Sequence, residues 1–148
     1  MRAGRDGGRE PRGSARGADV AAETLAWAEP RLQSGPVLVY STAEPGAVKA
    51  VQTQLGVEHA GEMVERCIAA IARGLVERGV RQLVVAGGET SGACVQALGI
   101  TRMQIGAQID PGVPWCHAQS DCGPLHVTLK SGNFGSDDFF TKAFGVLT

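Results

Sequence analysis

The stretch Leu83–Leu98, LVVAGGETSGACVQAL, decides the fold that we expect for this chain. The apolar run Leu83–Ala86 reads as a buried strand, Gly87 and Gly88 break it, and the residues that follow read as a helix. Glycines let a backbone approach a ligand closely, and the free N–H groups and dipole of a helix start attract anions. We therefore expect this turn to hold the phosphates of a nucleotide.

The polar residues after the two glycines fit the same interpretation. Thr90 and Ser91 can cap the helix, and their hydroxyls can also contact a phosphate. Glu89 is equally compatible with two roles, a ligand of Mg²⁺ and a solvated side chain. A single carboxylate is enough for the first role, because Mg²⁺ takes only one or two carboxylates and leaves its other positions to phosphates and water.

A second glycine turn, KSGNFG at residues 130–135, repeats this arrangement of strand, glycine turn and helix. It follows the alternating strand Leu125–Leu129 and precedes a short helix. Lys130 adds a positive charge and Asn133 an amide. If the two preceding strands run in the same direction, both turns lie at one sheet edge, where such proteins bind ligands. Ordinary turn chemistry, without a ligand, is the alternative for each turn taken alone.

Strands and helices alternate along the rest of the chain, which predicts an α/β fold with a largely parallel sheet, helices on its faces and both glycine turns at the strand C-terminal edge. The other expected strands are Val37–Tyr40 and Thr101–Ile105, and the expected helices are Asp19–Leu32, residues 45–55, Glu58–Gly79 and Phe139–Phe144.

Two segments between the expected strands are interpreted as loops. Residues 110–115 contain two prolines and a glycine, and His117–Gly123 is expected to form a hairpin-like excursion. Trp115 either stacks on a base or pins its loop to the core. Asp110, Asp137 and Asp138 are further candidates for Mg²⁺, although for the last two a helix-capping role is the stronger interpretation.

Composition excludes several classes of protein. The net charge of −1 gives no reason to expect nucleic acid or a membrane surface as a partner. No apolar run is long enough to span a bilayer, and because the first residues contain no apolar stretch we expect no secretory signal. The four cysteines form no CxxC pair, which favours reduced thiols in a cytoplasmic protein. Walker, GxGxxG and GxSxG motifs are absent.

The chain divides by composition into three parts. Residues 1–18 are rich in Arg and Gly and nearly lack bulky apolar side chains, so we expect a disordered tail or a misplaced translation start. Residues 19–34 form a weak helix and a linker. Residues 35–148 contain the expected nucleotide-binding domain.

At three motifs, VVAGGETSGACVQALG, IDPGVPW and LKSGNFGSDDFF, the sequence resembles the C-terminal nucleotide-binding domain of the four-carbon acid sugar kinases. The resemblance covers roughly residues 35–144, and the motifs occur in the order of the family. It implies phosphorylation of threonate, erythronate or 3-oxo-tetronate with ATP and Mg²⁺. It also implies that Gly87, Gly88, Glu89, Thr90 and Gly132 contact ATP.

The same resemblance implies a missing part. Family members are about three times as long, and their sugar-acid-binding domain and one serine of the ATP site lie upstream of the position of Gly35. The expectation is therefore the ATP-binding piece of a kinase, as a split partner, a truncated gene product or a fragment, inactive without the substrate domain. A non-catalytic module that binds a nucleotide or a phosphorylated metabolite, and a fragment without function, are the alternatives.

Overall fold

The computed structural model describes residues 2–4, 17–41, 49, 53 and 56–147. The chain divides into two compact units, residues 1–74 and 75–148. The expected disordered tail falls largely outside the described residues, and so does most of the helix expected at residues 45–55. None of the helices in the described ranges combines the length and apolar character that crossing a bilayer requires.

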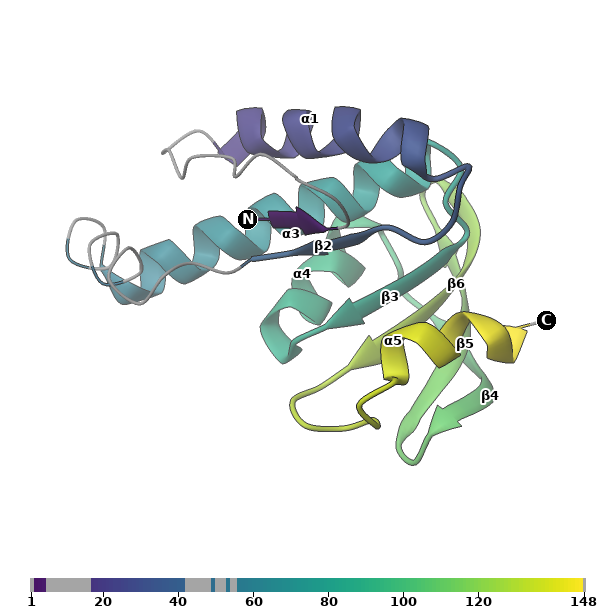
Figure 1. Cartoon of the computed structure of the whole chain (residues 1–148). Coiled ribbons are helices and arrows are strands. Elements are labelled where there is room, and N and C mark those ends of the chain that lie inside the picture. The colour runs from purple at the N-terminus through teal and green to yellow at the C-terminus, as the bar shows by residue number, and fades with distance from the viewer. Residues whose placement is uncertain (1, 5–16, 42–48, 50–52, 54–55, 148) are drawn as a thin grey trace. The chain divides into compact units, whose positions relative to one another are not determined.

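Among its described residues, the first unit contains the helices α1 and α3 and a small two-stranded sheet (Figure 1). Strands β1 (Arg2–Gly4) and β2 (Leu38–Tyr40) pair antiparallel. Helix α1 (Gly17–Ala28) continues into the 3-10 turn η1 (Glu29–Arg31), which confirms a helix where the sequence predicts one over Asp19–Leu32.

Helix α3 (Val57–Glu77) confirms the long helix expected over Glu58–Gly79, and its last residues belong to the second unit. Most of its apolar stripe is buried, as the three- and four-residue spacing of Cys67, Ile71 and Leu75 predicts. Val64, at the start of the predicted stripe, is instead 39% exposed. Within the first unit, the Leu25 side chain of α1 fills the space beside Gly74, where a larger residue would collide with it.

The second unit is built on a four-stranded sheet with the order β3-β6-β5-β4. Its strands are β3 (Gln82–Ala86), β4 (Met103–Asp110), β5 (Val113–Ser120) and β6 (Gly123–Lys130). Strands β3 and β6 are parallel, whereas β6 with β5 and β5 with β4 are antiparallel. The fold is thus α/β with a mixed sheet, and the prediction of a largely parallel sheet is wrong.

The physical reason is that two turns are shorter than the sequence suggests. A parallel connection needs about a dozen residues or more, but Pro111 and Gly112 alone join β4 to β5, and Asp121 and Cys122 alone join β5 to β6. Residues 110–115 are therefore a tight turn leading into a strand, not a loop. His117–Gly123 contains the end of β5, a two-residue turn and the start of β6, so the expected hairpin-like excursion is confirmed as part of the β5–β6 hairpin. The strand expected over Thr101–Ile105 starts at Met103 and runs to Asp110.

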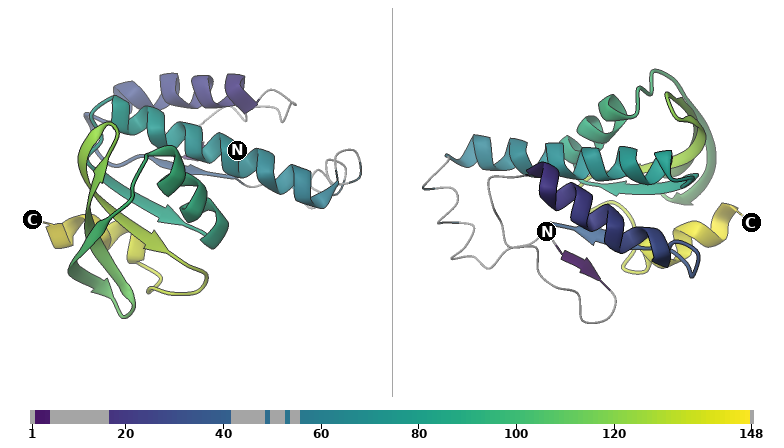
Figure 2. Two further views of the ribbon diagram at one scale, coloured as in Figure 1. Left: turned by 180° about the vertical axis from the view of Figure 1, so that it is seen from behind. Right: turned by 90° about the horizontal axis from the view of Figure 1, so that it is seen from above.

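Each face of this sheet has its own apolar core. Helix α4 (Gly88–Ala97) covers one face, where Leu98, Leu125 and Val127 are buried together. Helix α5 (Phe139–Lys142) and the 3-10 turn η2 (Ala143–Leu147) cover the other (Figure 2). The alternation expected for residues 125–129 is confirmed, since Leu125, Val127 and Leu129 share the α4 face.

Trp115 anchors the second core, which decides between its two interpretations. Its side chain is 1% exposed, and its indole N–H donates a hydrogen bond of 2.7 Å to the Ala143 carbonyl. Its ring also contacts Phe144, with centroids 6.0 Å apart. A buried ring whose polar atom is already bonded cannot stack on a base, so Trp115 pins the C-terminal segment to the sheet.

Replacing Trp115 by Phe should lower the free energy of unfolding by about 1–3 kcal/mol, because the buried Ala143 carbonyl then loses its hydrogen-bond donor. The matched control is Trp27→Phe, at a half-buried tryptophan whose ring stacks with the exposed Arg31. We expect the control to shift the midpoint of urea unfolding much less. Equal shifts for the two variants would contradict the anchoring role of the indole.

Candidate functional site

The two glycine turns begin side by side, because the strands that lead into them are parallel neighbours. In the register of β3 and β6, Ala86 lies opposite Lys130. One residue further, the Gly87 N–H donates a hydrogen bond of 2.8 Å to the Lys130 carbonyl. Both strands thus end at the same edge and at the same level (Figure 1). The expectation that the turns share one sheet edge is confirmed.

The first turn opens helix α4 without a side-chain cap. Gly87 is the N-cap residue, with φ 111° and ψ 135°, and no side chain bonds the helix start. The Ser91 N–H donates the first intrahelical bond, 2.9 Å long, to the Gly87 carbonyl. The N–H groups of Gly88, Glu89 and Thr90 precede it, so helix geometry gives them no intrahelical acceptor. They are donors available to an anion.

The two glycines of this turn do different things. Gly87 has the positive φ, which L residues rarely adopt. Gly88 is the first helical residue, without a positive φ, and a Cβ built on it would meet no atom within 4 Å. Gly88 therefore leaves open space above the helix start, which a phosphate can enter.

The polar residues of the turn take different positions from those expected. Thr90 and Ser91 lie inside the first turn of α4 and do not cap it. The Thr90 hydroxyl lies beside Gly87, whereas the Ser91 hydroxyl is buried and has no hydrogen-bond partner in the described part of the chain. Glu89 is exposed. Ser91 is thus unsuited to contact a phosphate from solvent.

The second turn folds back on its own backbone. The Lys130 ammonium donates a hydrogen bond of 2.9 Å to the Gly132 carbonyl, and the Phe134 N–H donates one of 3.2 Å to Ser131. Gly132 has φ 49°, and a Cβ there would meet nothing within 4 Å. Asn133 is exposed. This turn therefore combines an open backbone position with a cation beside it.

A polar cluster ties the far end of this turn to strand β4. The Asp110 carboxylate accepts hydrogen bonds from the Ser136 N–H at 2.9 Å and from its hydroxyl at 3.0 Å. The Lys142 ammonium pairs with Asp110 and lies 3.7 Å from the Asp138 carboxylate. Because β4 runs in the same direction as β6, Asp110 lies at the edge where the turns begin. The segment after β6 is thus fixed at both ends.

This cluster shifts the pKa values of its members. Hydrogen bonds from Lys142 and Ser136 lower the pKa of Asp110 below its usual 3.8, and the bond to Asp110 raises the pKa of Lys142 above 10.5. The Asp110–Lys142 pair therefore contributes its full stabilisation between pH 3.8 and pH 10.5. The stabilisation is lost as the pH falls through the lowered pKa of Asp110, or rises through the raised pKa of Lys142.

The same cluster bears on the Mg²⁺ candidates. Asp110 and Asp138 are engaged with Lys142 and Ser136, and Asp138 stands at the N-cap of α5 without a side-chain capping bond. Among the described residues, no three His, Cys, Asp or Glu side chains converge as a metal cage. An ion at this edge would therefore depend on phosphate oxygens for most of its ligands.

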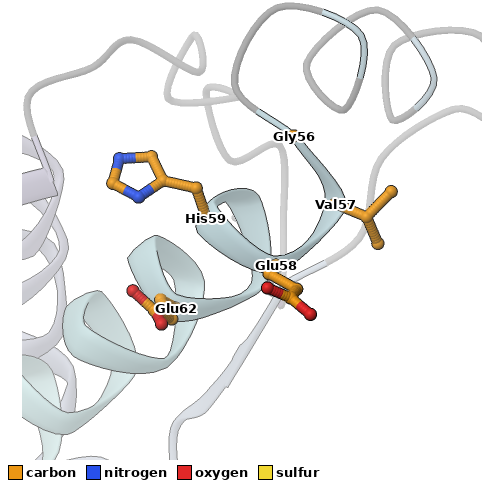
Figure 3. A pocket seen from close by; sticks show the side chains of 5 residues that line it. All are labelled: Gly56, Val57, Glu58, His59 and Glu62. Carbon is orange, nitrogen blue, oxygen red and sulfur yellow. The ribbon is translucent and has the colours of Figure 1, made fainter.

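A hollow also lies at the start of α3, in the first unit, where Figure 3 shows its lining residues. It is lined by Gly56, Val57, Glu58, His59 and Glu62. Two of these side chains are carboxylates, and His59 and Val57 point to opposite sides of the helix (Figure 3). This combination repels a polyphosphate and assembles no catalytic group.

Sequence reasoning missed three residues at the sheet edge. Ser136 and Lys142 hold the Asp110 carboxylate, and Phe134 presents an exposed ring from the second turn. The spacing from Asp138 to Lys142 is the i, i+4 pattern of a helical ion pair, which signals part of the cluster. The contact with Asp110 is long-range and has no local signal.

The chain is similar to one known protein family and to several individual proteins. The family described as "Nucleotide-binding C-terminal domain" matches residues 10–140. A 3-oxo-tetronate kinase of Burkholderia multivorans is 60% identical over 138 residues, which are 93% of this chain and 32% of that protein. The 3-oxo-tetronate kinase of Cupriavidus necator is 55% identical over 134 residues, which are 90% of this chain and 30% of that protein.

Solved structures show the same relation. A Haemophilus influenzae protein superposes with a TM-score of 0.76 at 42% identity, over 88% of this chain and 31% of that one. A Salmonella typhimurium protein superposes with a TM-score of 0.71 at 36% identity, over 89% and 32%. The chain thus spans about a third of the length of the relatives it matches.

Replacing Asp110 by Asn should lower stability at neutral pH, because Lys142 then loses the carboxylate to which it is hydrogen-bonded and keeps only the more distant Asp138. We expect the difference from the unchanged protein to shrink as the pH falls from 3.8 through the lowered pKa of Asp110, because the carboxyl is then protonated in the folded protein too. Urea unfolding midpoints across the acid range measure it, with the exposed neighbour Asp137→Asn as the control. A difference that stays constant down the acid range would contradict the ion pair.

Proposed function

Because the chain belongs to the nucleotide-binding C-terminal domains of the four-carbon acid sugar kinases, we propose that it holds ATP for the phosphorylation of a four-carbon sugar acid. The relatives named as 3-oxo-tetronate kinases make a 3-oxo-tetronate-type acid the leading substrate. Threonate and erythronate belong to the same chemical class.

One observation carries the proposal. The turn at Gly87–Thr90 and the turn at Gly132 start from paired positions of two parallel strands. Gly88 and Gly132 both leave the space above their backbone open. Two open turns at one level can contact neighbouring phosphates of a single polyphosphate chain, which one isolated turn cannot do.

The proposed contacts divide between the two turns. The N–H groups of Gly88, Glu89 and Thr90 donate to phosphate oxygens at the helix start, with Gly87 shaping the turn. Gly132 lets the second turn approach from the other strand, and the Lys130 ammonium keeps N–H donors beyond the one bonded to the Gly132 carbonyl. When bound, ATP supplies the phosphoryl group that is transferred.

The part played by these residues is positioning and charge stabilisation, which dominate phosphoryl transfer. Backbone N–H groups fixed by a helix and a paired strand need little reorganisation when charge develops on the phosphates. Mg²⁺ fits this arrangement through the phosphate oxygens, with Glu89 as the one exposed carboxylate in the first turn. The base for the acceptor hydroxyl lies, in this proposal, on another part of the kinase.

Because the chain covers only part of its relatives, we propose that ATP and the sugar acid bind to different parts of the kinase. The chain spans about 30% of the kinases it matches. We place the sugar-acid pocket in the part of those proteins that has no counterpart here. A nucleotide-binding module without catalysis is the second candidate, favoured by the same coverage.

Replacing Gly88 by Val should abolish the binding of ATP with Mg²⁺ in calorimetry while the fold is retained. The Val side chain would occupy the open space above the helix start, and no atom lies close enough to collide with it. The matched control is Gly92→Val, one turn further along α4, where a Cβ is equally unhindered.

We expect Gly92→Val to bind as the unchanged chain does, and circular dichroism to be alike for both variants. Unchanged affinity in Gly88→Val, or equal loss in both variants, would contradict the first turn as a phosphate site.

The chain alone should not release ADP from ATP and 3-oxo-tetronate in a coupled assay. Adding the N-terminal part of the Burkholderia multivorans relative should restore turnover, because it supplies the proposed sugar-acid pocket. Turnover by the chain alone would contradict the binding of ATP and the sugar acid to different parts of the kinase. ATP binding without turnover in the mixture would favour the non-catalytic module.

A further inference from the structure

Phe134 exposes an aromatic ring at the turn that we assign to ATP. Its side chain is 57% exposed, although Phe is among the most often buried residue types. It lies two residues after Gly132, so at most about 7 Å of backbone separates the two positions. An exposed aromatic ring next to a proposed phosphate contact is placed to meet the rest of a bound nucleotide.

The ring is positioned rather than loose. Its edge lies over Gly112 in the β4–β5 turn, where a Cβ would come within 3.2 Å of the Phe134 Cε1 atom. On one side the Phe134 N–H is bonded to the Ser131 carbonyl, and on the other Ser136 is fixed to Asp110. Ordering a ring before binding lowers the entropy cost of a ligand contact.

The other aromatic rings of the second unit are less suited to contact a nucleobase. Trp115 and Phe139 are buried, and the indole N–H of Trp115 is already bonded. Phe144 packs against Trp115. Phe140 is 42% exposed, but it lies on α5 and packs edge-on against Phe139, with ring centroids 5.7 Å apart.

We propose that the Phe134 ring is the platform on which the adenine of ATP stacks, while the two glycine turns hold its phosphates. The inference rests on the proposed nucleotide site and adds the element that recognises the base. A base stacked on a ring is held by its flat face, which every nucleobase offers, so the contact favours any nucleotide over a bare polyphosphate.

This mode of recognition has a consequence for specificity. Stacking uses no hydrogen bonds to the edge of the base, so it separates purines poorly. We therefore expect GTP to bind this chain nearly as well as ATP, and inorganic tripolyphosphate to bind more weakly than either.

The test measures the binding of ATP and of inorganic tripolyphosphate, each with Mg²⁺, by calorimetry on the 148-residue chain. Phe134→Leu removes the aromatic face and keeps an apolar side chain, whereas Phe134→Trp keeps a face. Phe140→Leu is the matched control, because it removes an exposed ring outside the turn. Circular dichroism checks the fold of each variant.

We expect Phe134→Leu to weaken ATP binding about five- to hundred-fold, the range measured for the loss of base stacking, and to leave tripolyphosphate binding unchanged. Phe134→Trp and Phe140→Leu should keep the affinity for ATP. Equal affinity of the unchanged chain for ATP and tripolyphosphate would overturn the platform and leave the phosphate site standing, as would an unaltered affinity in Phe134→Leu. Binding of neither ligand would overturn the proposed function together with the platform.

Discussion

The parallel pairing of β3 with β6 is the constraint on which the rest of the second unit depends. It is the only parallel pair in the described sheet, and it brings together segments that are more than forty residues apart in sequence. Because the strands run in the same direction and end at Ala86 and Lys130, their two outgoing turns start at one level. An antiparallel pairing would have sent the turns to opposite ends of the sheet.

The hydrogen bond from the Gly87 N–H to the Lys130 carbonyl extends this pairing into the turns themselves. It fixes the start of α4 against the end of β6. The Asp110 cluster then fixes the later part of the second turn from the far strand of the sheet, through Ser136 and Lys142. Both turns are thus held by long-range contacts, which suits a site that must be formed before its ligand arrives.

The sequence was sufficient to predict those elements of the fold that depend on neighbouring residues. Strand, glycine turn and helix at residues 83–98 are signalled by neighbours in the chain, and so is the alternation of residues 125–129. The sequence did not predict that most neighbouring strands are antiparallel. Proline and glycine occur both in two-residue turns and in longer loops, so Pro111 and Gly112 did not reveal how short the connection is. The sequence also left the role of Trp115 open, because the burial of its ring depends on packing against residues 139–147, which are distant in the chain.

The central claim is that the two glycine turns together bind one polyphosphate. It is tested most directly by following the amide signals of Gly88, Glu89, Thr90 and Gly132 by nuclear magnetic resonance while ATP with Mg²⁺ is added. We predict that all four signals shift together and follow a single dissociation constant, with amides in the first unit unaffected. Shifts in one turn alone, or different dissociation constants for the two turns, would contradict the claim.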